Sequence, residues 1–152
     1  MTNTHAPETA AQKTGRIVLG LFMTFAGIGH LTFARHEFQA QVPPWVPIPP
    51  DVTVLASGLV EIALGLAMIL MTRRRATVGL LLAAFFVAVF PGNIAQWLHH
   101  RDAFGLNSDS ARLVRLFFQP VLIAWALWST GAWSARGSTG AWRLLRRGTR
   151  NI

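Results

Sequence analysis

The chain has 152 residues, of which 52% are apolar and only 13% are charged, whereas an ordinary soluble domain carries roughly 25% charged residues. The high hydropathy excludes a disordered chain, and the absence of cysteine excludes a disulfide framework, a CxxC redox pair and a cysteine nucleophile. The net charge is +8, but the basic residues gather between long uncharged runs, which is typical of membrane spans and not of a nucleic-acid-binding face.

Four apolar runs are long enough to cross a bilayer as helices, because about 30 Å of hydrocarbon needs roughly 20 helical residues. They cover about residues 17–33, 52–71, 76–98 and 113–133. The first run is also where a signal peptide would lie, but its length and the lack of a following cleavage site favour a retained span. The sequence therefore predicts an all-α fold, an integral membrane four-helix bundle in antiparallel up-down order over residues 15–133.

The distribution of Lys and Arg predicts the orientation of this bundle. With both termini inside, ten basic residues lie on the inner segments and four on the outer side. This asymmetry follows the positive-inside rule and predicts that both termini are cytoplasmic. Residues 1–14 are expected to be disordered. Residues 134–152 form a basic tail that either lies on anionic lipid or is solvated.

Small residues in the spans predict helix contact faces, because lipid supplies no hydrophobic drive for helix association. The glycines concerned are Gly20, Gly27, Gly29, Gly58, Gly65 and Gly79. A ligand groove lined by glycine is the alternative interpretation. Pro91 and Pro120 predict kinks in the third and fourth spans.

A proline-rich segment at residues 42–50 separates the first two spans. Its prolines favour polyproline II, and we expect the segment to lie across the outer mouth of the bundle. Trp45 would then lie at the level of the lipid headgroups. The alternative is a rigid connector with no further role.

Every span also carries a polar side chain in its outer half, although ionisable groups within a bilayer are costly and usually face the bundle interior. Helical rise places these groups roughly 3 to 14 Å below the outer surface. They are His30, Glu61, Asn93, Arg115 and Gln119. Glu61 has to be protonated or paired. Of its two candidate partners, His30 and Arg115, the arginine is the nearer electrostatic match because it is always charged.

We expect these five residues to form one network lining a polar pocket. The alternative is interhelical glue, with each hydrogen bond contributing ~0.6 kcal/mol. Haem between His30 and His99 or His100 and a metal at His36, His99 and His100 are weaker alternatives, because the latter two histidines lie at or beyond the end of the third span. No phosphate loop, GxSxG or HExxH motif is present, so the sequence predicts no catalytic residue and no metal ligand.

The same segments resemble the DoxX-like family of small four-helix membrane proteins. The matching pieces are FAGIGHLTF at 25–33, the proline-rich loop, SGLVEIALG at 57–65, the arginine turn at 73–75, FPGN at 90–93 and RLFFQ at 115–119. Their order and spacing extend over about residues 15–130. The resemblance implies the four-helix fold and implies that the five polar residues are recurring positions of the family.

The resemblance also implies a link to membrane redox systems, since the family takes its name from a membrane subunit of an archaeal thiosulfate:quinone oxidoreductase. We therefore expect an accessory or quinone-interacting component of such a system, which is not an enzyme on its own, with a quinone in the outer pocket. The alternative is a non-catalytic scaffold or assembly partner of another membrane complex. The expected partners are the lipid bilayer and a membrane redox or assembly protein. A solute transporter is a further alternative, but it would need an oligomer, because four helices without an inverted repeat are too few to enclose a transport path.

Overall fold

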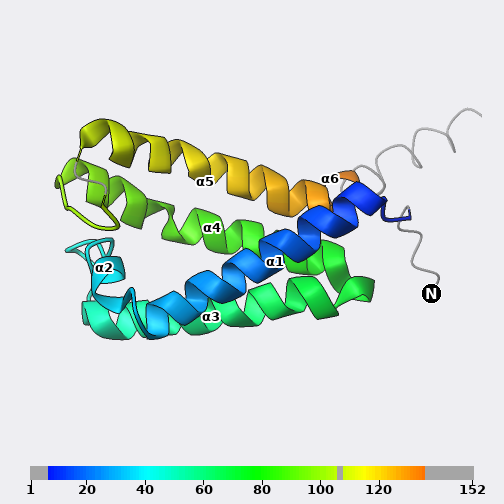
Figure 1. Cartoon of the computed structure of the whole chain (residues 1–152), viewed down its shortest axis with the longest axis horizontal. Coiled ribbons are helices and arrows are strands. Elements are labelled where there is room, and N and C mark those ends of the chain that lie inside the picture. Colours follow the sequence, from blue (N-terminus) through cyan, green and yellow to red (C-terminus); the bar gives the residue numbers. More distant parts are fainter. Residues whose placement is uncertain (1–6, 106–107, 136–152) are drawn as a thin grey trace, which may run out of the picture.

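The computed structural model describes residues 7–105 and 108–135, which form helices joined by turns and loops, with no strand in these ranges. Four long helices make up the bundle: α1 (Ala10–Leu31), α3 (Pro50–Leu70), α4 (Arg75–Leu98) and α5 (Asp109–Ser129). Three short elements connect or follow them: α2 (Arg35–Gln39), the 3-10 turn η1 (Thr72–Arg74) and α6 (Ala132–Ala135). Figure 1 shows the four long helices lying lengthwise beside one another.

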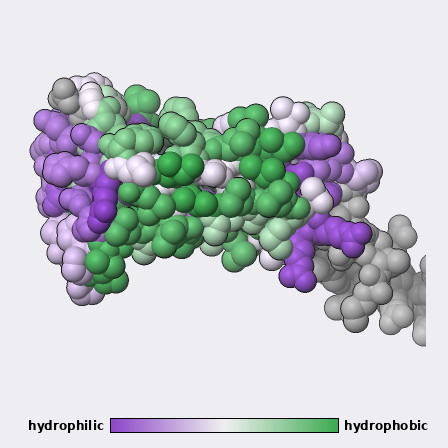
Figure 2. Space-filling model, turned by 60° about the horizontal axis from the view of Figure 1, so that its bottom comes forward, coloured by the Kyte–Doolittle hydropathy of each residue, from purple (hydrophilic) through white to green (hydrophobic). Residues whose placement is uncertain are grey.

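The surface has the apolar belt expected of a protein embedded in lipid. Hydrophobic side chains cover the middle of the molecule and polar ones gather at its two ends (Figure 2). All four long helices expose large hydrophobic residues, among them Phe25, Leu59, Leu81 and Phe117. Each of these helices is long and apolar enough to cross a membrane. The predicted all-helical fold with four spans is confirmed at this level, and the chain is a multi-pass membrane protein.

The first helix begins earlier than the sequence predicts. The Thr9 hydroxyl accepts a hydrogen bond from the backbone N–H of Gln12 at 3.2 Å, and the Gln12 side chain accepts one from the Thr9 N–H at 3.1 Å. This reciprocal capping box fixes the start of α1 at Ala10. The prediction of disorder through residue 14 is therefore wrong for residues 10–14. A search for apolar runs misses these two turns because they are polar. Residues 1–6 and 136–152, including most of the predicted basic tail, lie outside the described residues.

Glycines bring α1 and α3 into close contact. A Cβ atom on Gly20 would lie 2.8 Å from the carbonyl oxygen of Gly65, and one on Gly27 would lie 2.6 Å from that of Gly58. The two pairs show that α1 and α3 run in opposite directions, because the higher number on one helix faces the lower on the other. On α4, a Cβ on Gly79 would collide with Thr130. The predicted role of these glycines as helix contacts is confirmed. Gly29 differs, since its nearest neighbours are side chains of the following turn.

The apolar core fills one half of the bundle. It consists of buried side chains from all four long helices: Leu19, Met23, Met68, Val78, Leu82, Phe86 and Ala126. By their positions in the helices, these residues lie between the middle of the bundle and the end that holds the start of α1, the end of α3 and the end of α5; Figure 1 shows these three helix ends together. The other half of the bundle, where α2 and the α4–α5 loop lie, contains the polar side chains described below.

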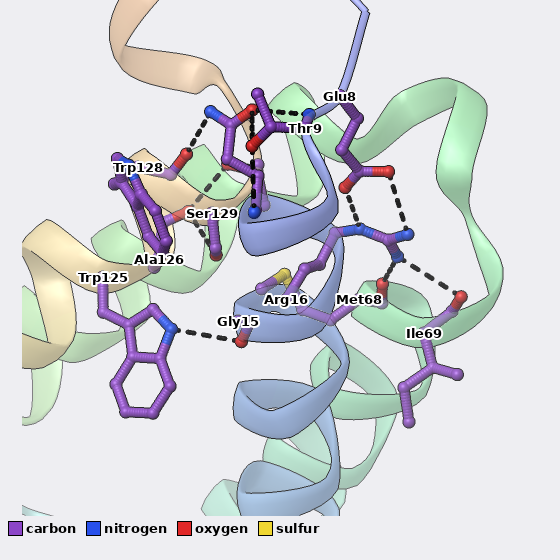
Figure 3. Close-up of polar contacts among 12 residues, drawn as sticks. Glu8, Thr9, Gly15, Arg16, Met68, Ile69, Trp125, Ala126, Trp128 and Ser129 are labelled. Carbon is purple, nitrogen blue, oxygen red and sulfur yellow. Dashed lines mark hydrogen bonds and ion pairs between the residues drawn. The ribbon is translucent and has the colours of Figure 1, made fainter.

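The side chain of Arg16 is almost completely buried, and its polar contacts connect α1 with the end of α3 (Figure 3). Its guanidinium donates to the carbonyl oxygens of Met68 and Ile69, in the last turn of α3, and forms an ion pair with Glu8 at 2.7 Å. Helix ends leave carbonyls without an intrahelical partner, so Arg16 completes the C-terminus of α3. From the sequence, Arg16 was only one of the ten basic residues on the inner segments, and its structural role was not predicted.

The start of α1 is also joined to the end of α5. The Trp125 indole donates to the carbonyl of Gly15 at 3.1 Å, and the Gln12 amide donates to that of Trp128 at 3.0 Å (Figure 3). Together with Arg16, these bonds hold α1, α3 and α5 at a common end of the bundle.

Both prolines lie inside continuous helices, Pro91 in α4 and Pro120 in α5. The predicted kinks at these positions stay predictions. The proline-rich loop departs from an uninterrupted polyproline II segment, because the N–H of Val46 donates to the carbonyl of Pro43 at 3.1 Å and closes a turn. The reason is that Val46, unlike a proline, has an N–H that can close such a bond.

Candidate functional site

A cavity of about 600 Å³ occupies the α2 end of the bundle. Side chains from α1, α3, α4 and α5 line it, together with α2, the proline-rich loop and Phe104 of the α4–α5 loop. Its walls are mostly apolar. All five polar residues singled out from the sequence are among the lining residues: His30, Glu61, Asn93, Arg115 and Gln119. The volume lies within the range of roughly 300–1,000 Å³ that small-molecule sites occupy.

His30 and Glu61 meet across the α1–α3 contact. The Nδ1 atom of His30 lies 3.2 Å from Glu61 Oε2 and 2.9 Å from the carbonyl oxygen of Ala26, one turn earlier in α1. A carbonyl oxygen can only accept, so Nδ1 carries the hydrogen and donates it to Ala26. Glu61 Oε2 consequently has no hydrogen bond within the described part of the chain, despite its burial. The close approach depends on Gly58, where a Cβ would lie 2.6 Å from the Cβ of His30.

Asn93 and Gln119 form a second pair, between α4 and α5. The Asn93 amide donates to the Gln119 oxygen at 2.9 Å, and the Gln119 amide donates to the carbonyl of Phe86 at 2.7 Å. Gln119 thus links the Asn93 side chain and the backbone of α4 to α5. Interhelical hydrogen bonds of this kind hold membrane helices together.

Arg115 forms no direct ion pair with Glu61, whose carboxylate meets His30 instead, although Arg115 is the charged group that interacts with that carboxylate electrostatically, as expected from the sequence. Its guanidinium carbon lies 4.6 Å from the centre of the Phe104 ring, a cation–π contact. Aromatic ring contacts then connect Phe104 to His30 of α1. Phe104 meets Phe38 of α2 edge-to-face at 4.6 Å, and Phe38 stacks on the His30 ring with 3.3 Å between ring centres. The five polar residues therefore share one cavity as two pairs and a separate arginine, rather than as one hydrogen-bonded network.

Phe38 and Phe104 are site residues that the sequence analysis missed. Phe38 lies outside the apolar runs, and Phe104 lies in a loop where its φ of 57° is a left-handed conformation uncommon for phenylalanine. That conformation is held by a hydrogen bond from the Phe104 N–H to the Glu37 carboxylate at 2.6 Å. The signal available in the sequence was only the presence of aromatic residues in both outer loops.

Three arginines fasten the loops that close this end. Arg101 donates to the carbonyls of Ala40 and Val42 at 3.2 and 3.0 Å, which joins the α4–α5 loop to the proline-rich loop. Arg112 is buried and pairs with Asp109 at 2.6 Å and with Asp102. Arg35 of α2 pairs with Asp51 at the start of α3, and this hydrogen bond raises the pKa of Arg35 above its usual value. Side-chain hydrogen bonds and ion pairs thus hold α2, the proline-rich loop and the α4–α5 loop in place at this end of the cavity.

The proline-rich loop forms part of the cavity wall, with Val42, Pro43, Trp45 and Val46 among the lining residues. Trp45 is 70% exposed, as suits a tryptophan at the membrane interface. On the lipid side, the lining residues Phe22, Val114 and Phe118 are each more than half exposed. The cavity is therefore bounded by α2, loops and aromatic rings at its end and by apolar side chains along its flank.

Three described histidines, His36, His99 and His100, are exposed and lie outside the cavity. His100, with a φ of 50°, pairs with Asp109 at 2.8 Å. Across residues 7–105 and 108–135, no group of three or more His, Asp or Glu side chains is placed to hold a metal ion.

The chain belongs to the family described as "Domain of unknown function (DUF8561)", whose pattern matches residues 19–130. This range covers well over half of the chain and contains all five polar residues of the cavity. No match was found among the curated proteins or among the solved structures. The resemblance to DoxX-like proteins stays a prediction.

Proposed function

We propose that this protein is a DoxX-like accessory component of a bacterial membrane redox system and that its cavity binds a quinone. The observation that carries this proposal is the cavity itself: an apolar space of about 600 Å³ on which a histidine, a carboxylate, an arginine and two amides converge. A quinone needs an apolar slot for its ring and tail, with a few polar groups to orient its oxygens.

The position of the cavity suits a ligand that is delivered by the membrane. Exposed apolar residues, Phe22 on α1 and Val114 and Phe118 on α5, border it on the flank. An isoprenoid tail could leave along these side chains while the ring stays near His30. At the ring end, Phe38 and Phe104 offer aromatic faces for stacking.

The orientation within the membrane is part of the proposal. We infer an up-down bundle with both termini in the cytoplasm, because the arginine turn at 73–75 and the basic tail then lie inside. The cavity, α2 and Trp45 would then lie toward the outer surface of the inner membrane. A redox or assembly partner on that side would meet the loops that close the cavity.

Binding of ubiquinone and menaquinone to the purified protein in lipid nanodiscs tests this proposal. We expect saturable retention of a labelled quinone above that of empty nanodiscs. His30→Ala should weaken binding by about tenfold, because it removes a ring that stacks on Phe38 and a group beside Glu61. His99→Ala is the matched control, since His99 is exposed and outside the cavity. Retention that never saturates, or equal affinity in both variants, would refute the quinone site.

A scaffold is the second candidate function, and the Asn93–Gln119 pair favours it. These two amides satisfy each other and the Phe86 carbonyl, which is how interhelical glue behaves. A scaffold would co-purify with a membrane complex in fixed stoichiometry, and Glu61→Gln would leave that association intact. Loss of quinone binding without loss of such a partner would separate the two functions.

A further inference from the structure

The cavity contains polar atoms whose hydrogen-bonding capacity is unused. Within the described part of the chain, two buried side-chain atoms have no hydrogen-bond partner, Glu61 Oε2 and Gln41 Nε2. Both residues line this cavity. Buried polar groups in native proteins are nearly always bonded, and an exception calls for an explanation such as a missing ligand or water. Two exceptions on the wall of one cavity indicate a group that would satisfy both.

Arg115 adds further unused donors to the same wall. Its guanidinium carries five N–H donors, yet in the described ranges its contact is the face of Phe104 and no hydrogen bond or ion pair engages it. An arginine within a membrane helix ordinarily finds an acceptor. The cavity wall thus carries donors from Arg115 and Gln41 as well as an oxygen of Glu61 that lacks a donor.

A ligand group that both accepts and donates a hydrogen bond satisfies all of these atoms at once. A quinone carbonyl accepts hydrogen bonds but has none to give, so it would serve Arg115 and Gln41 and leave Glu61 without a donor. A hydroxyl both accepts and donates. His30 cannot supply the missing donor to Glu61, because its Nδ1 hydrogen is given to Ala26.

We propose that the cavity selects the reduced, hydroxyl-bearing form of its ligand, a hydroquinone, with one hydroxyl donating to Glu61 and accepting from Arg115. This inference rests on the proposed quinone site and specifies its redox preference. Glu61 is taken as the acceptor of this hydroxyl because its Oε2 is the buried oxygen without a donor. Gln41, which lies directly before the proline-rich loop, also lines the cavity and supplies a donor for a second oxygen of the headgroup.

Three probes with the same decyl tail test the preference on the wild-type protein, without any substitution. Decylubiquinol, decylubiquinone and the dimethyl ether of decylubiquinol are compared under anaerobic conditions by retention on nanodiscs with and without protein. We expect the hydroquinone to bind at least about tenfold more tightly than either of the others, since a hydrogen bond to a carboxylate is charge-assisted. The ether keeps the ring and tail but cannot donate, so it isolates the hydroxyl hydrogen.

Glu61→Gln provides a second, directional readout. The amide can donate to a quinone carbonyl, so this variant should lose the preference for the hydroquinone and bind the quinone as well as wild type or better. His99→Ala, outside the cavity, should keep the wild-type order. Equal saturable binding of all three probes to wild type would overturn the redox preference and leave the quinone site standing. The same holds if the quinone binds more tightly than the hydroquinone. If none of the probes binds saturably, the quinone site fails and the preference fails with it.

Discussion

Gly27 and Gly29 lie two residues apart in α1, yet alanine at these positions is expected to act differently on stability. A Cβ on Gly27 would lie 2.6 Å from the Gly58 carbonyl oxygen and 2.7 and 2.9 Å from two atoms of Ile62, one of them backbone nitrogen. A Cβ on Gly29 would meet the Phe33 ring at 3.2 Å, and a side chain can move aside. Both variants gain the same helix propensity, about 1 kcal/mol, so the difference between them measures the contact alone.

Overpacking a close contact costs about 1–3 kcal/mol, and backbone atoms on α3 cannot move without shifting the helix. We therefore expect Gly27→Ala to be destabilised by about 1 kcal/mol net and Gly29→Ala to be as stable as wild type or stabilised by up to about 1 kcal/mol. The free energies of unfolding are compared by titrating dodecyl sulfate into detergent micelles while following far-UV circular dichroism. If Gly27→Ala proves at least as stable as Gly29→Ala, the close α1–α3 contact is wrong.

Three further predictions concern other parts of the molecule. Arg16→Met should lower the free energy of unfolding by about 2 kcal/mol, because it removes charged hydrogen bonds to the end of α3, whereas Arg73→Met, at an exposed position, should change it little; equal losses would contradict the capping role. Gln119→Leu should lose about 1–2 kcal/mol, since it leaves the buried Asn93 amide without its acceptor and removes the bond to the Phe86 carbonyl. A double-mutant cycle with Asn93→Leu should give a coupling energy of the same order, and strictly additive losses would argue against the pair. Because the chain has no cysteine, single cysteines report topology directly: Trp45→Cys should react with an impermeant maleimide on intact cells and Arg73→Cys only after lysis, and the reverse pattern would invert the proposed orientation.

Much of the fold was predictable because the bilayer imposes it. Residues 52–71 and 76–98 were predicted from apolar length alone, and the helices α3 and α4 agree with them to within a few residues. The start of α1 was not found in this way, since its first two turns carry Gln12, Lys13 and Arg16. Polar turns can be helical when a capping box and buried partners support them, and neither is visible as hydropathy.

The candidate site was predictable in its membership but not in its pairings. Depth along each span placed His30, Glu61 and Arg115 at similar levels, and all three line the cavity. Depth says nothing about rotation around the helix axis or about the distance between helices. Glu61 consequently meets His30, whose helix the glycines bring close, while Arg115 turns to Phe104.

The amino-acid sequence by itself determined that four helices cross the membrane and that each brings a polar group to the same half, since both follow from the cost of placing charge and backbone in hydrocarbon. The tertiary structure alone decided that a space remains between the α1–α3 pair and the α4–α5 pair. Phe38 of α2 and Phe104 of the α4–α5 loop close this space at one end. The tertiary structure also decided that Glu61 and Gln41 face that space without a partner. These features depend on contacts between segments far apart in the chain, and no local pattern encodes them.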